Sequence, residues 1–193
     1  MAAPTRKRAA IFGGSFDPVH LGHLKMLRVV SKELAFDKIV VMPCFVSPFK
    51  SSTVATSEQR VEMLEQGIAD MGLEGVTVSR FEIERERPSY SWETAEHFTQ
   101  LEPEVEWHWI LGTDQWSAIE KWAEPEKLRK LLRFVILTRD GDDVMPRDQW
   151  EYREIPFSHP ASSTAIRNNF SAHADWLTSS VLSFCEAKGL YGS

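Results

Sequence analysis

Two histidines spaced three residues apart follow a double glycine in the stretch "IFGGSFDPVHLGHL", near the start of the chain. We expect Gly13 and Gly14 to close a strand, where a backbone without Cβ atoms turns sharply and lets a phosphate approach its amides. The helix that follows carries unpaired N–H groups and about half a positive charge at its first turn. His20 and His23 project from one side of that helix and can donate hydrogen bonds to phosphate oxygens. The joint pattern predicts phosphate binding.

Each half of this pattern also has a simpler interpretation. A double glycine alone indicates a turn, and this one lacks the third glycine of the G-x-G-x-x-G dinucleotide fingerprint. An H-x-x-H pair is half of a zinc site, but no neighbouring cluster of cysteines or carboxylates supplies the remaining ligands. The sequence therefore favours phosphate binding with no metal held by the protein.

A second anion-binding pattern lies further along the chain, in "HPASSTAIRNN". Ser162 or Ser163 is placed to cap a short helix, and Arg167 follows one turn later. A helix start that combines hydroxyls with an arginine can bind an anion through free amides and charge-assisted hydrogen bonds. A solvated helix with an unrelated arginine is the alternative that this segment leaves open.

Strands and helices alternate along the chain. Apolar runs of strand length lie at 8–12, 38–43, 76–79, 106–111 and 133–137, and residues 150–155 alternate like an edge strand. The segments between them have helical spacing, and Thr56 with Gln59 forms a capping-box pattern. Such alternation predicts an α/β fold with a Rossmann-like, doubly wound parallel sheet and helices on both faces. Ligands bind such a sheet at the carboxyl ends of its strands.

The length of 193 residues fits a single domain, residues 1–193, with a small helical part over about 161–193. We expect the last helix to end at Gly189. Trp107 and Trp109 share one face of their strand, which favours core packing. Cys44 and Cys185 lie in apolar company, which favours reduced thiols and leaves a disulfide as the alternative.

Composition and charge exclude several classes of function. Hydrophobic residues make up 42% and charged residues 26%, which is typical of a globular protein with a core. The net charge of −6 argues against nucleic-acid binding, which depends on a basic surface. No segment approaches the roughly 20 apolar residues of a membrane span, and the N-terminus lacks a secretory apolar segment. We expect a cytoplasmic protein without a membrane partner; a homo-oligomer stays open.

The segment "GGSFDPVHLGHL" resembles the signature of the nucleotidyltransferases whose H-x-G-H element is shared with class I aminoacyl-tRNA synthetases. The double glycine and "FDPVH" resemble the bacterial nicotinate mononucleotide adenylyltransferases most closely. The short length and the lack of a K-M-S-K-S-like loop argue against a synthetase. The resemblance runs from about residue 9 to residue 191. It implies adenylyl transfer from ATP to nicotinate mononucleotide, a pyridine nucleotide, giving deamido-NAD and pyrophosphate in NAD biosynthesis.

The resemblance also implies roles for individual residues. It assigns catalysis to His20, His23 and Arg167. Contacts with ATP are implied for Gly13, Gly14, Ser15, Phe16, Lys50, Gly112, Asp114, Ser163 and Thr164. Contacts with the pyridine nucleotide are implied for Tyr90 and Ser91 in "RPSYSWET" and for Trp122, which follows "LGTDQW". Mg²⁺ is expected to travel with ATP on phosphate oxygens and water, because no acidic cage appears in the sequence.

This sequence departs from the family pattern at four positions that the resemblance covers. Phe49 replaces a usual histidine, Ser47 a usual proline, Ser91 a usual threonine and Ala161 a usual isoleucine. The first two lie in "MPCFVSPFK", the segment that carries Lys50.

Other functions share parts of these patterns. Adenylyltransferases that act on nicotinamide mononucleotide or phosphopantetheine have the same fold, but "SYSWET" and the tryptophans after "LGTD" favour a flat aromatic acceptor. A dehydrogenase would need the third glycine and an acidic residue after the second strand. A non-catalytic nucleotide-binding regulator could retain the same histidines and arginine. No Ser-His-Asp or Cys-His spacing indicates covalent catalysis, and an ionised mononucleotide phosphate needs none.

Overall fold

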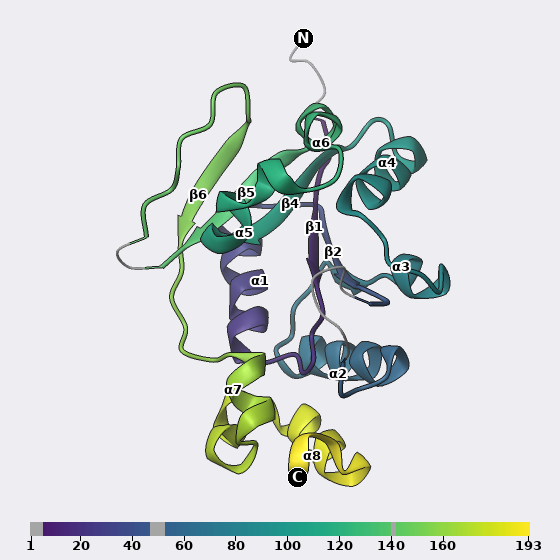
Figure 1. The fold of residues 1–193 in the computed structure, drawn as a ribbon, viewed down its shortest axis with the longest axis vertical. Helices are drawn as coiled ribbons and strands as arrows, with labels where there is room; N and C mark the ends of the chain where they lie inside the picture. The colour runs from purple at the N-terminus through teal and green to yellow at the C-terminus, as the bar shows by residue number, and fades with distance from the viewer. Residues whose placement is uncertain (1–5, 47–52, 140–141) are drawn as a thin grey trace.

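The computed structural model describes residues 6–46, 53–139 and 142–193. In this part of the chain, six strands form one parallel sheet in the order β3-β2-β1-β4-β5-β6 (Figure 1). The strands are β1 (Arg8–Gly14), β2 (Lys38–Pro43), β3 (Val76–Val78), β4 (Glu106–Gly112), β5 (Arg133–Thr138) and β6 (Tyr152–Pro156). The predicted doubly wound α/β sheet is confirmed, and β6 is an edge strand as expected.

Helices cover both faces of the sheet. They are α1 (Leu21–Leu34), α2 (Ser57–Asp70), α3 (Phe81–Glu84), α4 (Ser91–Leu101), α5 (Thr113–Ser117), α6 (Pro125–Leu131), α7 (Ser163–Asn168) and α8 (Ser179–Lys188), with 3₁₀ helices η1 (Ile119–Lys121), η2 (Ser171–Trp176) and η3 (Leu190–Gly192). Successive strand residues point to opposite faces. Ala10 and Phe12 join the core under α1, α2, α7 and α8, whereas Ala9 and Ile11 join the core under α4, α5 and α6.

Local sequence signals account for several of these boundaries. The amide of Thr56 donates to Oε1 of Gln59 at 2.8 Å, and the amide of Gln59 donates to Oγ1 of Thr56 at 3.2 Å, which confirms the capping box. Helix α8 ends at Gly189, whose φ of 59° is left-handed, as predicted. Trp107 and Trp109 are buried in the core, and both cysteines are free thiols.

The sequence pattern did not predict α3, α5 or the 3₁₀ helices. Each spans six residues or fewer, so an apolar period cannot be recognised over so short a stretch. These short elements follow the strands at the carboxyl end of the sheet and near the C-terminus, where tertiary contacts stabilise them.

The C-terminal helices lie beside α2. Ser180 donates to the carboxylate of Asp70 through its amide at 3.0 Å and its hydroxyl at 2.7 Å. Figure 1 shows α7, α8 and the C-terminus at the same end of the molecule as α2 and the start of α1. That all 193 residues form one folding unit stays a prediction. Within the described ranges, no helix is long and apolar enough to cross a membrane.

Candidate active site

The middle of the sheet has a topological switch point at its carboxyl end. Strands β1 and β4 are neighbours, and they end at Gly14 and Gly112. The chain continues from β1 toward β2 on one side and from β4 toward β5 on the other. Open parallel sheets bind ligands in the crevice that forms where the strand order reverses in this way.

The two glycines after the first apolar run are the last residues of β1. A Cβ on Gly13 would stand 3.1 Å from Cζ2 of Trp109, and one on Gly14 would stand 2.9 Å from Cζ of Phe16. Both positions therefore exclude side chains because aromatic rings pack over them. The sharp turn that we expected at the glycines lies instead at Phe16, which has a left-handed φ of 50°.

The ring of Phe16 packs against the ring of His23. Only 2% of this residue is exposed, and its ring centroid lies 5.5 Å from that of Phe12 and 5.1 Å from that of His23 in edge-on geometry. The ring is part of the core, so a contact between Phe16 and ATP would involve its backbone. Ser15, beside it, is half-buried and accepts a weak hydrogen bond from Sγ of Cys44 at 3.9 Å.

His20 and His23 lie together at the start of α1. His20 is the N-cap residue, and its amide donates a long hydrogen bond of 3.4 Å to Nδ1 of His23. The two rings stack with centroids 3.7 Å apart and planes at 23°. Among the described residues, the buried Nδ1 of His20 has no hydrogen-bond partner. Such an atom in a native site calls for a ligand or water.

Burial controls the charge of His20. It lowers the pKa of His20 to about 3, with a further contribution from the nearby His159. The ring is therefore neutral at pH 7 in the free protein and has one N–H to donate. An approaching polyphosphate favours the protonated form, which agrees with the role expected from the sequence.

The absence of a side chain at Gly22 leaves room for the ring of His20. Sequence reasoning did not identify Gly22 as a site residue. A Cβ on Gly22 would stand 2.9 Å from both Cε1 and Nδ1 of His20 and 3.4 Å from Nδ1 of His159. His159 accepts a hydrogen bond from the amide of Ala161 at 3.1 Å, and its Nε2 lies 3.2 Å from Nζ of Lys25. The glycine of H-x-G-H could have been found from its fixed position between the histidines.

The two anion-binding patterns of the sequence meet in space. From α7, the hydroxyl of Ser163 donates to the carbonyl of Pro18 at 2.9 Å, and Nη1 of Arg167 donates to the carbonyl of Asp17 at 2.6 Å. Nη2 of Arg167 also donates to Oγ1 of Thr164 at 3.1 Å. Helix α7 is thus fastened to the loop that leads into α1. Ser162 is its N-cap residue, without a capping hydrogen bond from its own side chain.

Arg60 is a second cation at this end of the sheet, and sequence reasoning missed it. Its side chain is completely buried. It donates to the carbonyls of Ser15 at 2.8 Å and Phe45 at 3.1 Å, and to the hydroxyl of Ser57 at 3.1 Å. Arg60 therefore joins the loops after β1 and β2. Because charged residues in α2 look alike in sequence, no local signal distinguishes this arginine from a solvated one.

The segment predicted to bind the pyridine lies at the start of α4. Tyr90 is the N-cap residue and is 49% exposed, and Ser91 begins the helix. Glu93 accepts hydrogen bonds from the amide of Tyr90 at 2.9 Å and from Arg85 at 2.6 Å. In the described part of the chain, no hydrogen bond or ion pair joins Tyr90 or Ser91 to the histidine pair.

A buried carboxyl group in α3 is hydrogen-bonded to α4, the helix that begins beside Tyr90. Glu82 of α3 accepts a hydrogen bond from the hydroxyl of Thr94 in α4 at 2.6 Å. Burial raises the pKa of Glu82 to about 7, with a smaller contribution from Glu93. The protonated carboxyl group is therefore well populated at neutral pH.

The remaining predicted residues follow β4. Gly112 is the N-cap of α5, with open space where a Cβ would stand, and Asp114 is exposed in the first turn. Trp122 is half-buried after η1, and its ring meets that of Trp109 edge-on at 6.4 Å. Trp109 covers Gly13, so Trp122 lies at the same end of the sheet as the double glycine. Lys50, with Ser47 and Phe49, lies outside the described residues.

The donor set suits phosphates better than metals. No group of three or more histidines, cysteines or carboxylates that could hold a metal ion occurs in residues 6–46, 53–139 and 142–193. The candidate site instead contains imidazole and guanidinium N–H groups, hydroxyls and backbone amides. These groups donate hydrogen bonds to anionic oxygens.

Known proteins match almost the whole chain. The family profile described as cytidylyltransferase-like matches residues 11–169. A protein of Methylacidiphilum infernorum named "Probable nicotinate-nucleotide adenylyltransferase" is 36% identical over 171 residues, which cover 84% of this chain and 80% of that protein. A protein of the same name from Aliarcobacter butzleri is 35% identical over 162 residues, covering 83% and 86%.

A solved structure agrees in fold. The nicotinic acid mononucleotide adenylyltransferase of Plasmodium falciparum, complexed with NaAD, superposes with a TM-score of 0.81 at 20% identity. The match covers 96% of this chain and 97% of that one. From the extent of the family and relative matches, the chain belongs to the cytidylyltransferase-like family and, within it, to the nicotinate-nucleotide adenylyltransferases.

Proposed function

We propose that this protein transfers the adenylyl group of ATP to nicotinate mononucleotide, giving deamido-NAD and pyrophosphate. The observation that carries the chemistry is the attachment of α7 to the loop before α1, which sets Arg167 beside the start of the helix that bears His20. The names of the relatives support nicotinate mononucleotide as the acceptor.

The reaction needs positioning more than acid–base chemistry. The phosphate of the acceptor is already ionised at pH 7, and its oxygen forms a bond to the α-phosphorus of ATP. The bond from that phosphorus to the bridging oxygen breaks, and the electron pair leaves with pyrophosphate. Holding the two phosphates in line and stabilising charge on the leaving group are then the tasks of the protein.

The site residues divide these tasks. His20 and His23 donate to the α- and β-phosphates, and the unpartnered ring nitrogen of His20 supports this role. Arg167, with Ser163 and Thr164, contacts the β- and γ-phosphates. Further contacts with ATP come from Gly13, Gly14, Ser15, Phe16, Lys50, Gly112 and Asp114. Mg²⁺ enters as part of the substrate MgATP, held by phosphate oxygens and water, and neutralises part of the phosphate charge.

The pyridine ring of the acceptor is expected to stack on Trp122, which is half-buried beyond β4. Tyr90, with 49% of its surface exposed at the start of α4, and Ser91, in the first turn of that helix, are expected near the carboxylate of the acceptor. The first turn of a helix also offers unpaired amides to such an anion.

Pyrophosphate release tests the proposal directly. The protein is given MgATP with nicotinate mononucleotide, nicotinamide mononucleotide or phosphopantetheine in parallel reactions. We expect turnover with the first acceptor to exceed that with the other two. Equal turnover of both pyridine nucleotides would preserve the adenylyl transfer and remove the preference for the acid. Absence of turnover with all three acceptors would contradict the proposal and favour a nucleotide-binding regulator.

A variant of His20 tests the assigned chemistry. His20→Ala removes a donor that acts on transition-state charge, so kcat is expected to fall by about 10²–10³-fold. His173→Ala is the matched control, because the ring of His173 stacks on Trp176 in η2 and, among the described contacts, on neither histidine of the pair. A His20→Ala protein that keeps near-normal turnover would refute the assignment.

A further inference from the structure

The carboxylate of Asp17 is buried in the loop between β1 and α1, with 4% of the residue exposed. Three neutral donors reach it: the amides of Val54 and Ala55, at 2.8 and 3.0 Å, and the hydroxyl of Tyr191, at 2.7 Å. A buried carboxylate is stable only when its oxygens accept hydrogen bonds. These donors therefore determine where Asp17, and with it the loop, can lie.

The bonds of Asp17 connect three segments of the candidate site. Val54 and Ala55 lie between Lys50 and the start of α2 in sequence. Arg167 of α7 donates to the backbone carbonyl of Asp17 at 2.6 Å. A shift of Asp17 would consequently move the attachment point of Arg167 and the loop that leads to the histidine pair.

Tyr191 is held firmly where its hydroxyl meets Asp17. Only 7% of the residue is exposed, and its ring stacks on that of Phe170 at 6.3 Å. Its φ of 61° lies in the left-handed region, which is unfavourable for a residue with a Cβ. Such a conformation persists where the surroundings over-determine it, and it clusters at functional sites.

We propose that Tyr191 is a positioning residue for adenylyl transfer. Its hydroxyl fixes Asp17, and Asp17 fixes Arg167 against the loop that leads to His20. The inference rests on the proposed function, because that function assigns Arg167 and His20 to the phosphates of ATP. Tyr191 touches no reacting atom and acts only through Asp17. Helix η3 is then part of the active-site framework as well as of the core.

Removing the hydroxyl alone separates positioning from packing. Tyr191→Phe keeps the ring in its apolar surroundings and deletes one donor to the carboxylate. The matched control is Tyr152→Phe, because Tyr152 is half-buried, packs on Trp116 and lies in the edge strand β6, which β4 and β5 separate from β1. For each protein, kcat, both KM values and the Tm are measured.

We expect Tyr191→Phe to lower kcat about tenfold, the effect of losing one hydrogen bond to a charged group. The KM for nicotinate mononucleotide should stay within about twofold of wild type. Tm should fall more than in the Tyr152→Phe control, because a buried hydrogen bond to a carboxylate is lost, while the variant stays folded at the assay temperature. A kcat within twofold of wild type would overturn the proposal. So would a loss of activity that merely parallels a loss of folded protein.

A double-mutant cycle with Asp17→Ala tests whether Tyr191 acts through Asp17. If it does, Tyr191→Phe costs at most about twofold more in the Asp17→Ala background, because the shared bond is already absent. Two full, multiplicative losses would show independent roles and overturn the proposal.

Binding of inorganic pyrophosphate, measured by calorimetry, needs no acceptor substrate. We expect Tyr191→Phe to weaken pyrophosphate affinity about tenfold, because Arg167 is misplaced. If the wild type does not use nicotinate mononucleotide, the proposed function fails. The pyrophosphate-binding measurement still tests the role of Tyr191. An unchanged affinity would overturn that role.

Discussion

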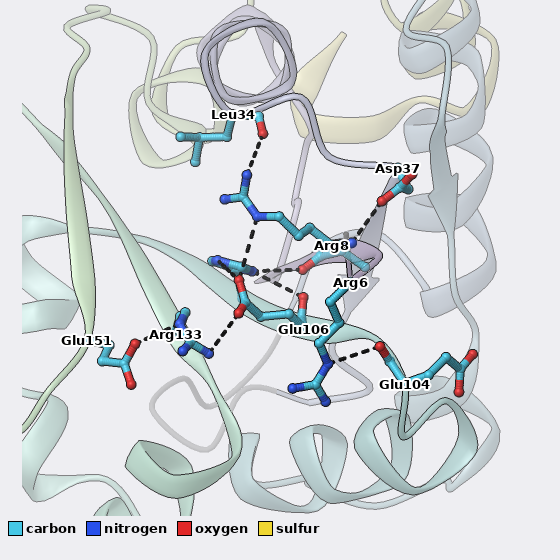
Figure 2. A network of polar contacts seen from close by, with 10 residues as sticks. Arg6, Arg8, Leu34, Asp37, Glu104, Glu106, Arg133 and Glu151 are labelled. Atoms are coloured by element: carbon cyan, nitrogen blue, oxygen red, sulfur yellow. Dashed lines mark hydrogen bonds and ion pairs between the residues drawn. The ribbon is translucent and has the colours of Figure 1, made fainter. Parts of the chain in front are cut away.

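At the amino end of the sheet Arg8 and Arg133 are paired with carboxylates, whereas at the carboxyl end Arg60 and Arg167 donate to backbone carbonyls. Figure 2 shows Arg133 between Glu106 and Glu151, and Arg8 beside Glu106. Arg133 lies 3.1 Å from Glu106 and 2.7 Å from Glu151, and Arg8 lies 3.6 Å from Glu106. Nε2 of His108 lies 3.5 Å from the same glutamate. A cavity of about 280 Å³ lies among these side chains.

Arg60 and Arg167, at the carboxyl end, have no such carboxylate partner among their described contacts. Arg60 and Arg167 donate to carbonyl and hydroxyl oxygens, which carry no formal charge. The Asp17 carboxylate is bonded there by neutral donors. The positive charge of Arg60 and Arg167 is therefore not neutralised by a paired carboxylate, whereas Arg8 and Arg133, which line the cavity at the other end, are paired with glutamates. The partners of the arginines, rather than their number, distinguish a substrate site from a structural network.

The largest test of this difference compares one arginine from each end. Arg167→Ala should lower kcat by about 10²–10³-fold, because its charge is aimed at the phosphates in the transition state. Arg133→Ala should change kcat less than about twofold, because the Arg133 charge is already paired with Glu106 and Glu151. Steady-state pyrophosphate release with MgATP and nicotinate mononucleotide measures both. Similar losses in the two variants would remove the distinction between the ends.

A smaller effect is expected from a methyl group placed against His20. In Gly22→Ala the new Cβ would stand 2.9 Å from the His20 ring, which must shift, so kcat should fall about 10–100-fold. In Gly67→Ala, the control, the new Cβ would stand 3.0 Å from Cδ1 of Leu24, which can move. The control should change Tm and leave kcat unchanged. Normal kcat in Gly22→Ala would show that the position of the ring is unimportant.

Two buried groups give stability opposite dependences on pH. The folded-state pKa of His20, about 3, lies below its unfolded value of 6.5, so its contribution to stability is lost as pH falls from 6.5 toward 3. The folded-state pKa of Glu82, about 7, lies above its unfolded value of 4.5, so its contribution is lost as pH rises from 4.5 toward 7. For each group, the free energy of unfolding changes by at most about 1.4 kcal/mol per pH unit.

Urea unfolding at several pH values between 4.5 and 7 checks both signs, a range set by the pKa values of the two groups. His20→Asn should lessen the loss of stability on acidification, and Glu82→Gln should lessen the loss on approach to neutral pH. Slopes equal to that of the wild type in both variants would contradict the assigned burial.

The smallest effect is expected at the amino end. Glu106→Gln removes the charge that Arg8, Arg133 and His108 share, and it should cost about 1 kcal/mol of unfolding free energy because the pairs are partly exposed. Turnover should change less than twofold. The freed arginine charge should also make inorganic phosphate stabilise this variant more than the wild type in thermal unfolding. Failure of phosphate to do so would weaken the argument from charge compensation.

Periodicity predicted the helices and strands of the sheet well. The strand predicted at residues 38–43 matches β2, and the helical spacing predicted between the strands at 76–79 and 106–111 matches α4, because both patterns depend on neighbours within a few residues. Thr56 and Gln59 cap α2 for the same reason. Elements of one turn, such as α3 and α5, were missed because their stability comes from contacts with distant segments.

The candidate site was predicted in part. Sequence patterns identified the histidine pair and Arg167, since these residue types at fixed spacing indicate anion binding. They did not identify Arg60, because only the tertiary structure distinguishes a buried arginine from an exposed one. They placed the sharp turn at the double glycine, whereas β1 continues through Gly14 and the left-handed residue is Phe16. They also missed the packing on Gly13, because Trp109, whose ring covers it, comes from another strand.

By itself, then, the sequence determined the alternating elements, the two anion-binding patterns and the resemblance to a nucleotidyltransferase family, all of which are encoded within short stretches of chain. Only the tertiary structure decided the charge of His20, the partners of each arginine and the bond between Asp17 and Tyr191, which lie 174 residues apart. Burial and long-range hydrogen bonds depend on which surfaces meet when the chain folds, and no local pattern carries that information.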